Sequence, residues 1–346
     1  MALYYRNEAG YHPTPRSLPQ AGNLPYIRHT MEYRPLGPTG IRVSEICLGT
    51  MQFKWTTSEA QSYRVLDHFF AEGGNFVDSA DIYSFWAKGC KGGESETIIG
   101  KWMSRRGNRR QVILATKAHG RMWPGATGEG LGRAHLVQAC EDSLKRLRTD
   151  YIDLYQSHSS DSSVPIEETL KAYDDLIRAG KVRYIGCSNY TSGEFAEALA
   201  VSRAMGLPQY VSIQPYYHPM ARDFEKDHAW LCRKYSVSVI PYSPLSGGFF
   251  TGKYRRNRPV PKTERARGLK WLMNDKGWKT VETLERLGRK RGKTVAQMAL
   301  GWHLSHDWMT APIIGANTVK QLSNLLGAAG LKLTPEEVKA IEKAGA

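Results

Sequence analysis

The chain has 346 residues, 41% hydrophobic and 23% charged, a composition typical of globular proteins and unlike that of disordered or collagen-like chains. No window approaches the roughly 18 unbroken apolar residues of a membrane span, and no apolar signal core follows the N-terminus, so we expect a cytoplasmic protein without membrane contact. The net charge of +15 raises nucleic acid as a partner, but residues 255–293, with fourteen Lys or Arg and four Asp or Glu, hold +10 of it. Neither zinc-finger spacing nor an aromatic-basic RNA-binding signature accompanies this segment, and we expect no nucleic acid.

The first elements along the chain are an extension and a hairpin. Residues 1–30 are rich in Pro, Gly, Tyr and Arg and show no periodicity, which predicts an irregular N-terminal extension. The stretch MEYRPLGPTGIRV, which starts at Met31, has two strand-like pieces joined by a Gly-Pro turn and predicts a β-hairpin. We therefore expect one domain over residues 31–346.

Eight short apolar runs alternate with amphipathic stretches after the hairpin. The runs are ICLGT (46–50), NFVDS (75–79), VILATK (112–117), IDLYQSH (152–158), YIGCSN (184–189), VSIQPY (211–216), SVIPYS (238–243) and APIIGA (311–316). Helical stretches fall near 57–72, 94–104, 133–148, 165–179, 191–205 and 221–235, with two more after residue 278 and another after residue 317. Eight βα units predict an α/β fold, a closed (β/α)8 TIM barrel with an N-terminal hairpin and extra C-terminal helices.

The cysteines indicate free thiols. All five are far apart along the chain and show no paired metal-ligand spacing, so neither a disulfide nor a metal site is expected: Cys47, Cys90, Cys140, Cys187 and Cys232. Cys187 lies in an apolar run and is expected to be a small buried hydrophobe.

Polar residues gather where three neighbouring predicted strands end. FVDSADIY places Asp78 at the end of one strand and Tyr83 five residues later, Lys117 ends the next strand, and His158 ends the one after it. Active sites of closed parallel barrels lie at the C-terminal ends of the strands. Each side chain alone has a structural explanation, but together they predict a catalytic group.

The chemistry of this group favours protonation of a carbonyl oxygen. An ammonium beside Tyr83 would favour the phenolate and lower the phenol's pKa, and a carboxylate would keep that ammonium charged and in place. A histidine would orient the carbonyl oxygen. Because no side chain supplies hydride, an external donor is required.

The sequence from Met31 to about Ala329 resembles the aldo-keto reductase superfamily, in the subgroup of bacterial aldo/keto reductases and potassium-channel beta subunits. The resemblance is carried by LGTMQF, FVDSADIYS, GGESETIIGKWM, VILATK, DYIDLYQSH, IRAGKVRYIGCSNY, IQPYYHPMAR, PYSPLSGGFFTGKY and PIIGANTVKQL. It implies NADPH-dependent reduction of an aldehyde or ketone to the alcohol. Tyr83 would be the general acid, supported by Lys117, Asp78 and His158.

The resemblance also implies a nicotinamide cofactor across the barrel mouth. Ser188, Asn189 and Gln214 match residues that bind the carboxamide, and Tyr242 matches the aromatic residue that stacks on the nicotinamide. The remaining matches are a pyrophosphate loop with Ser243, Pro244, Leu245, Gly247 and Lys253, and an adenosine segment with Gly315, Ala316, Asn317 and Gln321. The family usually has an asparagine four residues after this glutamine, where this chain has Leu325. NADP is expected over NAD.

Four aromatic residues in loops after the first three strands are the candidate substrate pocket: Phe53, Trp55, Trp86 and Trp123. They favour an apolar or cyclic carbonyl compound, and a sugar ketone, an aromatic aldehyde and a terpenoid ketone all stay open. A cofactor-binding regulatory module with little turnover, of the channel beta-subunit type, is the alternative. Self-association into a homo-oligomer also stays open.

Overall fold

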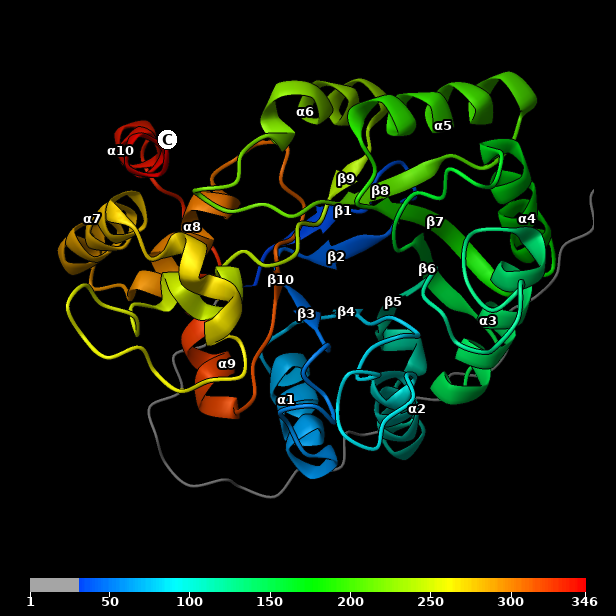
Figure 1. Ribbon diagram of the computed structural model, residues 1–346, viewed down its shortest axis with the longest axis horizontal. Helices are drawn as coiled ribbons and strands as arrows, with labels where there is room; N and C mark the ends of the chain where they lie inside the picture. Colours follow the sequence, from blue (N-terminus) through cyan, green and yellow to red (C-terminus); the bar gives the residue numbers. More distant parts are fainter. Residues whose placement is uncertain (1–30) are drawn as a thin grey trace, which may run out of the picture.

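Eight parallel strands form the centre of the molecule, as the alternation of apolar runs predicts. The computed structural model describes residues 31–346 (Figure 1), and the predicted extension over residues 1–30 lies outside the described residues. The strands are β3 (Cys47–Gly49), β4 (Phe76–Asp78), β5 (Ile113–Ala118), β6 (Ile152–Ser157), β7 (Val182–Ser188), β8 (Tyr210–Gln214), β9 (Ser238–Val239) and β10 (Ile313–Ile314). Their spatial order is β10-β3-β4-β5-β6-β7-β8-β9. All eight predicted runs contain a strand.

The first and last strands of this order are joined by backbone hydrogen bonds. The amide of Ile313 donates to the carbonyl of Pro241 over 2.9 Å, and that of Thr310 donates to Val239 over 2.9 Å. Val239 also forms a parallel bridge with Met309. These bonds close the ring, and the fold is the predicted (β/α)8 barrel.

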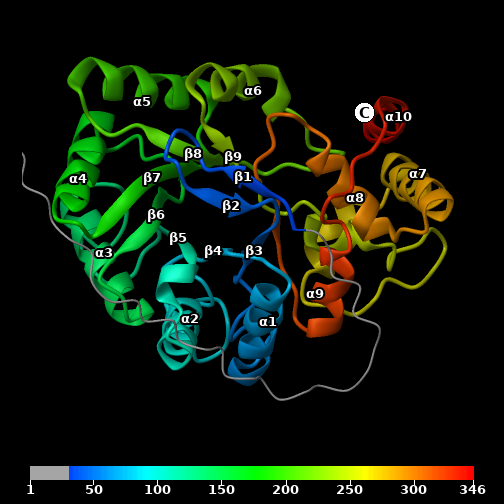
Figure 2. The same ribbon diagram turned by 180° about the vertical axis from the view of Figure 1, so that it is seen from behind.

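The predicted hairpin covers the end of the barrel opposite the strand C-termini. It consists of β1 (Tyr33–Pro35) and β2 (Arg42–Ser44), paired antiparallel, and lies across the strands when the molecule is seen from behind (Figure 2). Its buried side chains join those of the barrel interior in one apolar cluster: Leu36, Val43, Cys47, Phe76, Ala115, Leu154, Val211, Ile240, Ala311 and Ile313. The polar site therefore has to lie at the other end.

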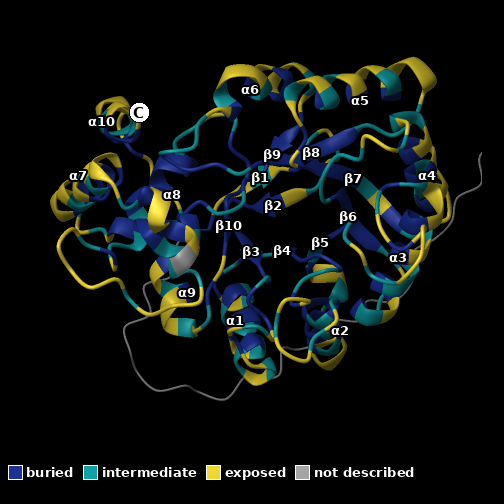
Figure 3. Ribbon diagram, viewed as in Figure 1, coloured by how far each residue is buried: buried dark blue, intermediate teal, exposed yellow. Residues whose placement is uncertain are grey.

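Helices surround the barrel with apolar faces turned inward, so that the strands are buried and the outer helix faces exposed (Figure 3). They are α1 (Glu59–Ala71), α2 (Glu94–Arg106), α3 (Arg133–Leu147), α4 (Ile166–Arg178), α5 (Ser192–Met205), α6 (Phe224–Tyr235), α7 (Asp275–Arg291), α8 (Val295–Leu304), α9 (Val319–Leu326) and α10 (Pro335–Gly345). Short 3-10 turns occupy Arg109–Gln111, Ser246–Thr251 and Ala266–Leu272. No helix within residues 31–346 combines the length and apolar character of a membrane span.

Capping residues set several helix starts and account for one difference from the predicted ranges. Ser58 caps α1 by accepting from the amide of Gln61, as expected from its place before Glu59. The helix predicted after residue 278 begins earlier, at Asp275, because the Asn274 side chain accepts from the amide of Gly277 over 2.9 Å. All five cysteines are free, and Cys187 is buried as predicted.

Candidate active site

Asp78 is the centre of a buried polar network at the C-terminal end of the barrel. It ends β4, is 1% exposed, and its Oδ2 accepts a hydrogen bond from Lys117 Nζ over 2.6 Å. Its Oδ1 accepts from the amide groups of Gln156 (3.2 Å) and Gln214 (2.9 Å). One carboxylate thus connects β4, β5, β6 and β8.

Lys117 connects this carboxylate to Tyr83. Its ammonium is fully buried and donates to Asp78, to the carbonyl oxygen of Ser79 over 2.7 Å, and to Tyr83 Oη over 3.1 Å. Burial acts to lower the pKa of Lys117, but the attraction of Asp78 and Tyr83 outweighs it and the pKa is raised. The lysine is therefore charged across the neutral range.

The pKa of Tyr83 differs from the sequence-based expectation. Burial raises it above its ordinary value, while Lys117 acts in the expected direction and lowers it. Desolvation of the phenolate is the larger effect, so the prediction of a net lowered pKa is wrong for this structure. Tyr83 consequently holds its proton at neutral pH. The Lys117 ammonium, 3.1 Å away, would stabilise the negative charge of the phenolate if that proton were lost.

His158 lies next to the Tyr83 ring. The two rings are 5.9 Å apart between centroids in an edge-on arrangement. Burial lowers the pKa of His158 to about 3, helped by repulsion from Lys117 and His119, so the imidazole is neutral near pH 7. Its ring nitrogens make no hydrogen bond within residues 31–346, which leaves them available to a ligand. The structure thus brings all four predicted catalytic residues together.

The residues predicted to hold a carboxamide form a connected group beside Asp78. Ser188 Oγ donates a hydrogen bond to the backbone carbonyl oxygen of Gln214 over 2.7 Å. The side-chain amide of Asn189 donates one to the backbone carbonyl oxygen of His158 over 2.9 Å. Tyr242 Oη donates to Asn189 Oδ1 over 3.0 Å. The Tyr242 ring, half-buried at the mouth, is 5.4 Å from that of Tyr216.

The loop after β9 has an unusual backbone and an unpaired cation. Ser243, Ser246, Gly247 and Gly248 all have positive φ. Gly248 has a φ of +96°, which favours glycine, and Lys253 Nζ lies next to it, 2.8 Å from where a Cβ would stand. Lys253 is exposed and has no acidic partner within the described part of the chain. Pro244 and Leu245 in this loop are buried.

The predicted adenosine segment follows β10 and leads into α9. Gly315 is exposed and Ala316 is buried, with its carbonyl oxygen accepting from Gln52 over 3.2 Å. The backbone amide of Asn317 donates a hydrogen bond to Gln321 Oε1 over 2.8 Å. Leu325 is 5% exposed within the hydrophobic core, while Asn324 is exposed. The Leu325 side chain therefore faces away from any ligand on this helix.

The four candidate pocket aromatics lie in different surroundings. Trp86, 39% exposed, stands 6.3 Å from Tyr83 and 5.6 Å from the half-buried Trp55. Phe53 is fully buried in the main core, and Trp123 stacks on His135 at 4.8 Å. Trp55 and Trp86 are thus the two that face open space near the phenol.

A model of the aldo/keto reductase family matches residues 45–346. The chain belongs to this family. It is 36% identical to an uncharacterized oxidoreductase, YrpG, of Bacillus subtilis over 311 residues, covering 88% of this chain and 93% of YrpG. It is 30% identical to versiconal hemiacetal acetate reductase of Aspergillus parasiticus over 341 residues (90% and 96%) and 33% identical to that fungus's norsolorinic acid reductase B over 328 residues (90% and 84%).

This aldo/keto reductase contains a site residue that sequence reasoning missed. Arg265 packs over the Trp55 ring at 5.4 Å and has no acidic partner within residues 31–346. Burial lowers its pKa, while Tyr83 and Tyr254 act to raise it; Trp55, beneath the guanidinium, contacts Trp86, which in turn contacts Tyr83. The basic composition of residues 255–293 was the available signal, but it did not single out this position.

Gln156 was also missed, because its sequence context resembles that of any strand residue. It shares Asp78 Oδ1 with Gln214, and Gly186 on the next strand makes room for it: a Cβ there would lie 3.2 Å from Gln156 Cγ. Two amides and one ammonium therefore fill three of the four lone-pair sites of the buried carboxylate.

Proposed function

We propose that this oxidoreductase reduces an aldehyde or ketone to the alcohol with NADPH, and that Tyr83 protonates the carbonyl oxygen. The observation that carries the proposal is the buried contact of Lys117 with both Asp78 and Tyr83. A neutral phenol beside a permanent ammonium is a proton donor whose conjugate base is already stabilised. The cofactor, when bound, supplies the hydride.

His158 and Asp78 complete the machinery in different ways. Because His158 is neutral above about pH 3, its ring N–H donates a hydrogen bond to the carbonyl oxygen and fixes it against Tyr83 Oη. Asp78 does not touch the substrate; it holds Lys117 charged and in place. Proton transfer from Tyr83 then creates a phenolate in direct contact with that ammonium.

The residues around the mouth fit a nicotinamide dinucleotide. Ser188, Asn189 and Gln214 offer hydroxyl and amide groups for the carboxamide, and Tyr242 offers a ring face. Lys253 and Arg265 are cations without acidic partners among residues 31–346, and the positive-φ backbone between Ser243 and Gly248 permits close approach of phosphate. These groups suit the pyrophosphate, which NADH and NADPH share, and the choice of NADPH rests on the net basic charge and the family resemblance of the sequence.

An aromatic or polycyclic carbonyl compound is the substrate class that the mouth favours. Trp86 and Trp55 present ring surfaces next to Tyr83, and flat apolar substrates gain burial and edge-to-face contacts there. Two of the fungal relatives are named as reductases of versiconal hemiacetal acetate and norsolorinic acid, which supports testing aromatic ketones first.

Tyr83→Phe tests the proposal, with Tyr63→Phe as the matched control. Tyr63, on α1, hydrogen-bonds Glu59 and lies outside the network of Asp78. We expect parent and control to bind NADPH, seen as a change in tryptophan fluorescence, and to oxidise it at 340 nm with an aromatic aldehyde. Tyr83→Phe should bind NADPH equally well and lose at least ~100-fold in kcat.

Three outcomes would contradict parts of this proposal. Near-full turnover by Tyr83→Phe would remove its role as the acid. NADPH binding by the parent without turnover on any carbonyl would favour a cofactor-binding regulatory module. If the parent bound neither NADPH nor NADH, the proposed cofactor site at the barrel mouth would be wrong.

A further inference from the structure

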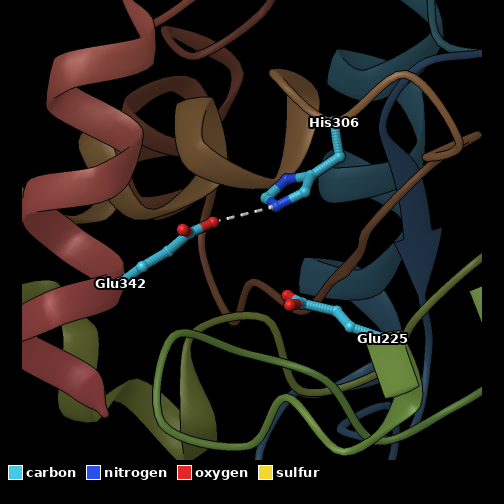
Figure 4. A group of neighbouring side chains, drawn as sticks. All are labelled: Glu225, His306 and Glu342. Carbon is cyan, nitrogen blue, oxygen red and sulfur yellow. Dashed lines mark ion pairs between the residues drawn. The ribbon is translucent and has the colours of Figure 1, made fainter.

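A cluster of three potential metal ligands lies outside the network of Asp78. Glu225 belongs to α6, His306 follows α8, and Glu342 belongs to α10, and Figure 4 shows their polar atoms turned toward one another. One donor atom from each lies within 4.8 Å of the other two. The side chains are 26%, 11% and 23% exposed, so the site is partly shielded from solvent.

His306 presents an unused lone pair to the two carboxylates. Its Nδ1 lies 2.8 Å from the carbonyl oxygen of Trp302, and because a carbonyl only accepts, Nδ1 carries a proton, so that in the neutral imidazole Nε2 holds the lone pair. The nearest groups to Nε2 are Tyr217 Oη at 3.4 Å and Glu342 Oε1 at 3.7 Å. Since Tyr217 donates its proton to Glu225 over 2.5 Å, the neutral imidazole and the two carboxylates present three acceptors to one another, and a cation between them would satisfy all three.

The two carboxylates retain capacity for a cation. Arg222 binds Glu225 through Nε–Oε1 (2.8 Å) and Nη2–Oε2 (2.7 Å), and Tyr217 uses the second lone pair of Oε1. One lone pair of Glu225 Oε2 therefore stays free. Glu342 has no hydrogen-bond donor within residues 31–346, its nearest cation being Arg222 Nη2 at 3.6 Å. Two carboxylates and one guanidinium leave an excess negative charge.

Neighbouring side chains keep Glu225 ionised and hold the His306 ring in position without a bound ion. Burial acts to raise the pKa of Glu225, but the hydrogen bonds from Arg222 and Tyr217 outweigh it and lower the pKa, so the carboxylate is ionised. The His306 ring packs edge-on against Trp302 at 4.6 Å and lies 5.1 Å from Trp308. A histidine whose second nitrogen is bound to a carbonyl is the usual arrangement of a metal ligand.

We propose that Glu225, His306 and Glu342 bind one divalent transition-metal ion of the zinc type, which joins α10 to α6 and to the segment after α8. Imidazole with carboxylates suits Zn²⁺, and bond lengths of about 2.0–2.2 Å place tetrahedral donors about 3.3 Å apart. Glu342 accepts no hydrogen bond within residues 31–346 and is held only by the ion pair with Arg222 at 3.6 Å, so a rotation of its side chain closes the present gap. A proton shared between His306 and Glu342 in place of a metal ion would bring their polar atoms to about 2.7–3.0 Å. The observed distance of 3.7 Å fits this less well.

The test uses the full chain, stripped with a chelator and titrated calorimetrically with ZnCl2 at pH 7.5. His306→Asn keeps an amide donor for the Trp302 carbonyl and removes the ligand. Glu342→Gln removes a charge from a partly exposed position and should fold normally. Glu336→Gln, exposed on the same helix, is the control.

We expect the parent and Glu336→Gln to bind one Zn²⁺ that both His306→Asn and Glu342→Gln weaken at least ~10-fold. Saturating Zn²⁺ should raise the melting temperature of the parent by about 3–6 °C and that of the two ligand variants by much less. Neither readout depends on reductase activity, so the outcome is separate from that of the proposed function.

Two results would overturn the site. Zn²⁺ binding that persists unchanged in both ligand variants would place the ion on other histidines of the chain. A melting temperature that ignores Zn²⁺ but depends on pH in the parent and not in His306→Asn would assign the cation to a proton.

Discussion

Replacing Asp78 by asparagine would test the buried network directly. Asp78 Oδ2 accepts from an ammonium and Oδ1 accepts from two amides, so an asparagine must turn its own NH2 toward one of these donors. Lys117 would lose its counter-ion while remaining fully buried. Removing one partner of a buried ion pair costs about 3–5 kcal/mol, and loss of the lysine's proton limits the cost. We expect the free energy of unfolding to fall by about 3 kcal/mol at pH 7.

Urea unfolding is the assay, and its pH dependence has a definite sign. The pKa of Lys117 is raised above 10.5 in the folded parent, so the pair stabilises fully below that value and its contribution is lost as the pH rises through the raised pKa. The difference between parent and Asp78→Asn should thus be constant near neutrality and shrink in strong alkali. Asp223→Asn is the control, because its ion pair with Lys226 is exposed. Equal urea midpoints for the two variants would refute the reasoning.

Two further predictions concern the mouth. Because burial lowers the pKa of His158 to about 3, its titration should leave no inflection in kcat/KM between about pH 5 and 8; an inflection that His158→Gln abolishes would contradict this. Lys253→Met should weaken NADPH binding at least ~10-fold and reduce its dependence on salt, because one phosphate contact is removed. Lys262→Met, an exposed lysine nine residues further along the chain, is the control, and equal losses in both variants would indicate a general charge effect.

The barrel could be predicted from sequence because each strand is a short apolar run and each ends in polar residues. Asp78, Lys117 and His158 were found by position at strand ends, which the parallel topology brings to one rim. Gln156 and Arg265 were not, since nothing local distinguishes a strand glutamine or one arginine among many. The bounds of α7 depended on the side chain of Asn274, a single hydrogen bond that periodicity does not register.

The sequence also could not predict pKa values and side-chain distances that depend on how the chain packs. The sequence shows that an ammonium can lie near Tyr83, but not that desolvation exceeds its effect on the phenol's pKa. Likewise, Glu225, His306 and Glu342 are separated by up to 117 positions in sequence and show no ligand spacing. Only the tertiary packing, in which α10 lies against α7, brings them within 4.8 Å.

The two amides that share Asp78 Oδ1 couple the pKa of Tyr83 to the binding of a ligand at Gln214. Gln214 belongs to the proposed carboxamide site, and its amide also donates a hydrogen bond to the carboxylate that pairs with Lys117. A ligand that draws the Gln214 amide away removes one hydrogen bond from Asp78 Oδ1, which strengthens the attraction of the carboxylate for the ammonium and so shifts the pKa of Tyr83. Thermodynamic linkage then requires that protonation of this group change the ligand's dissociation constant by the same factor.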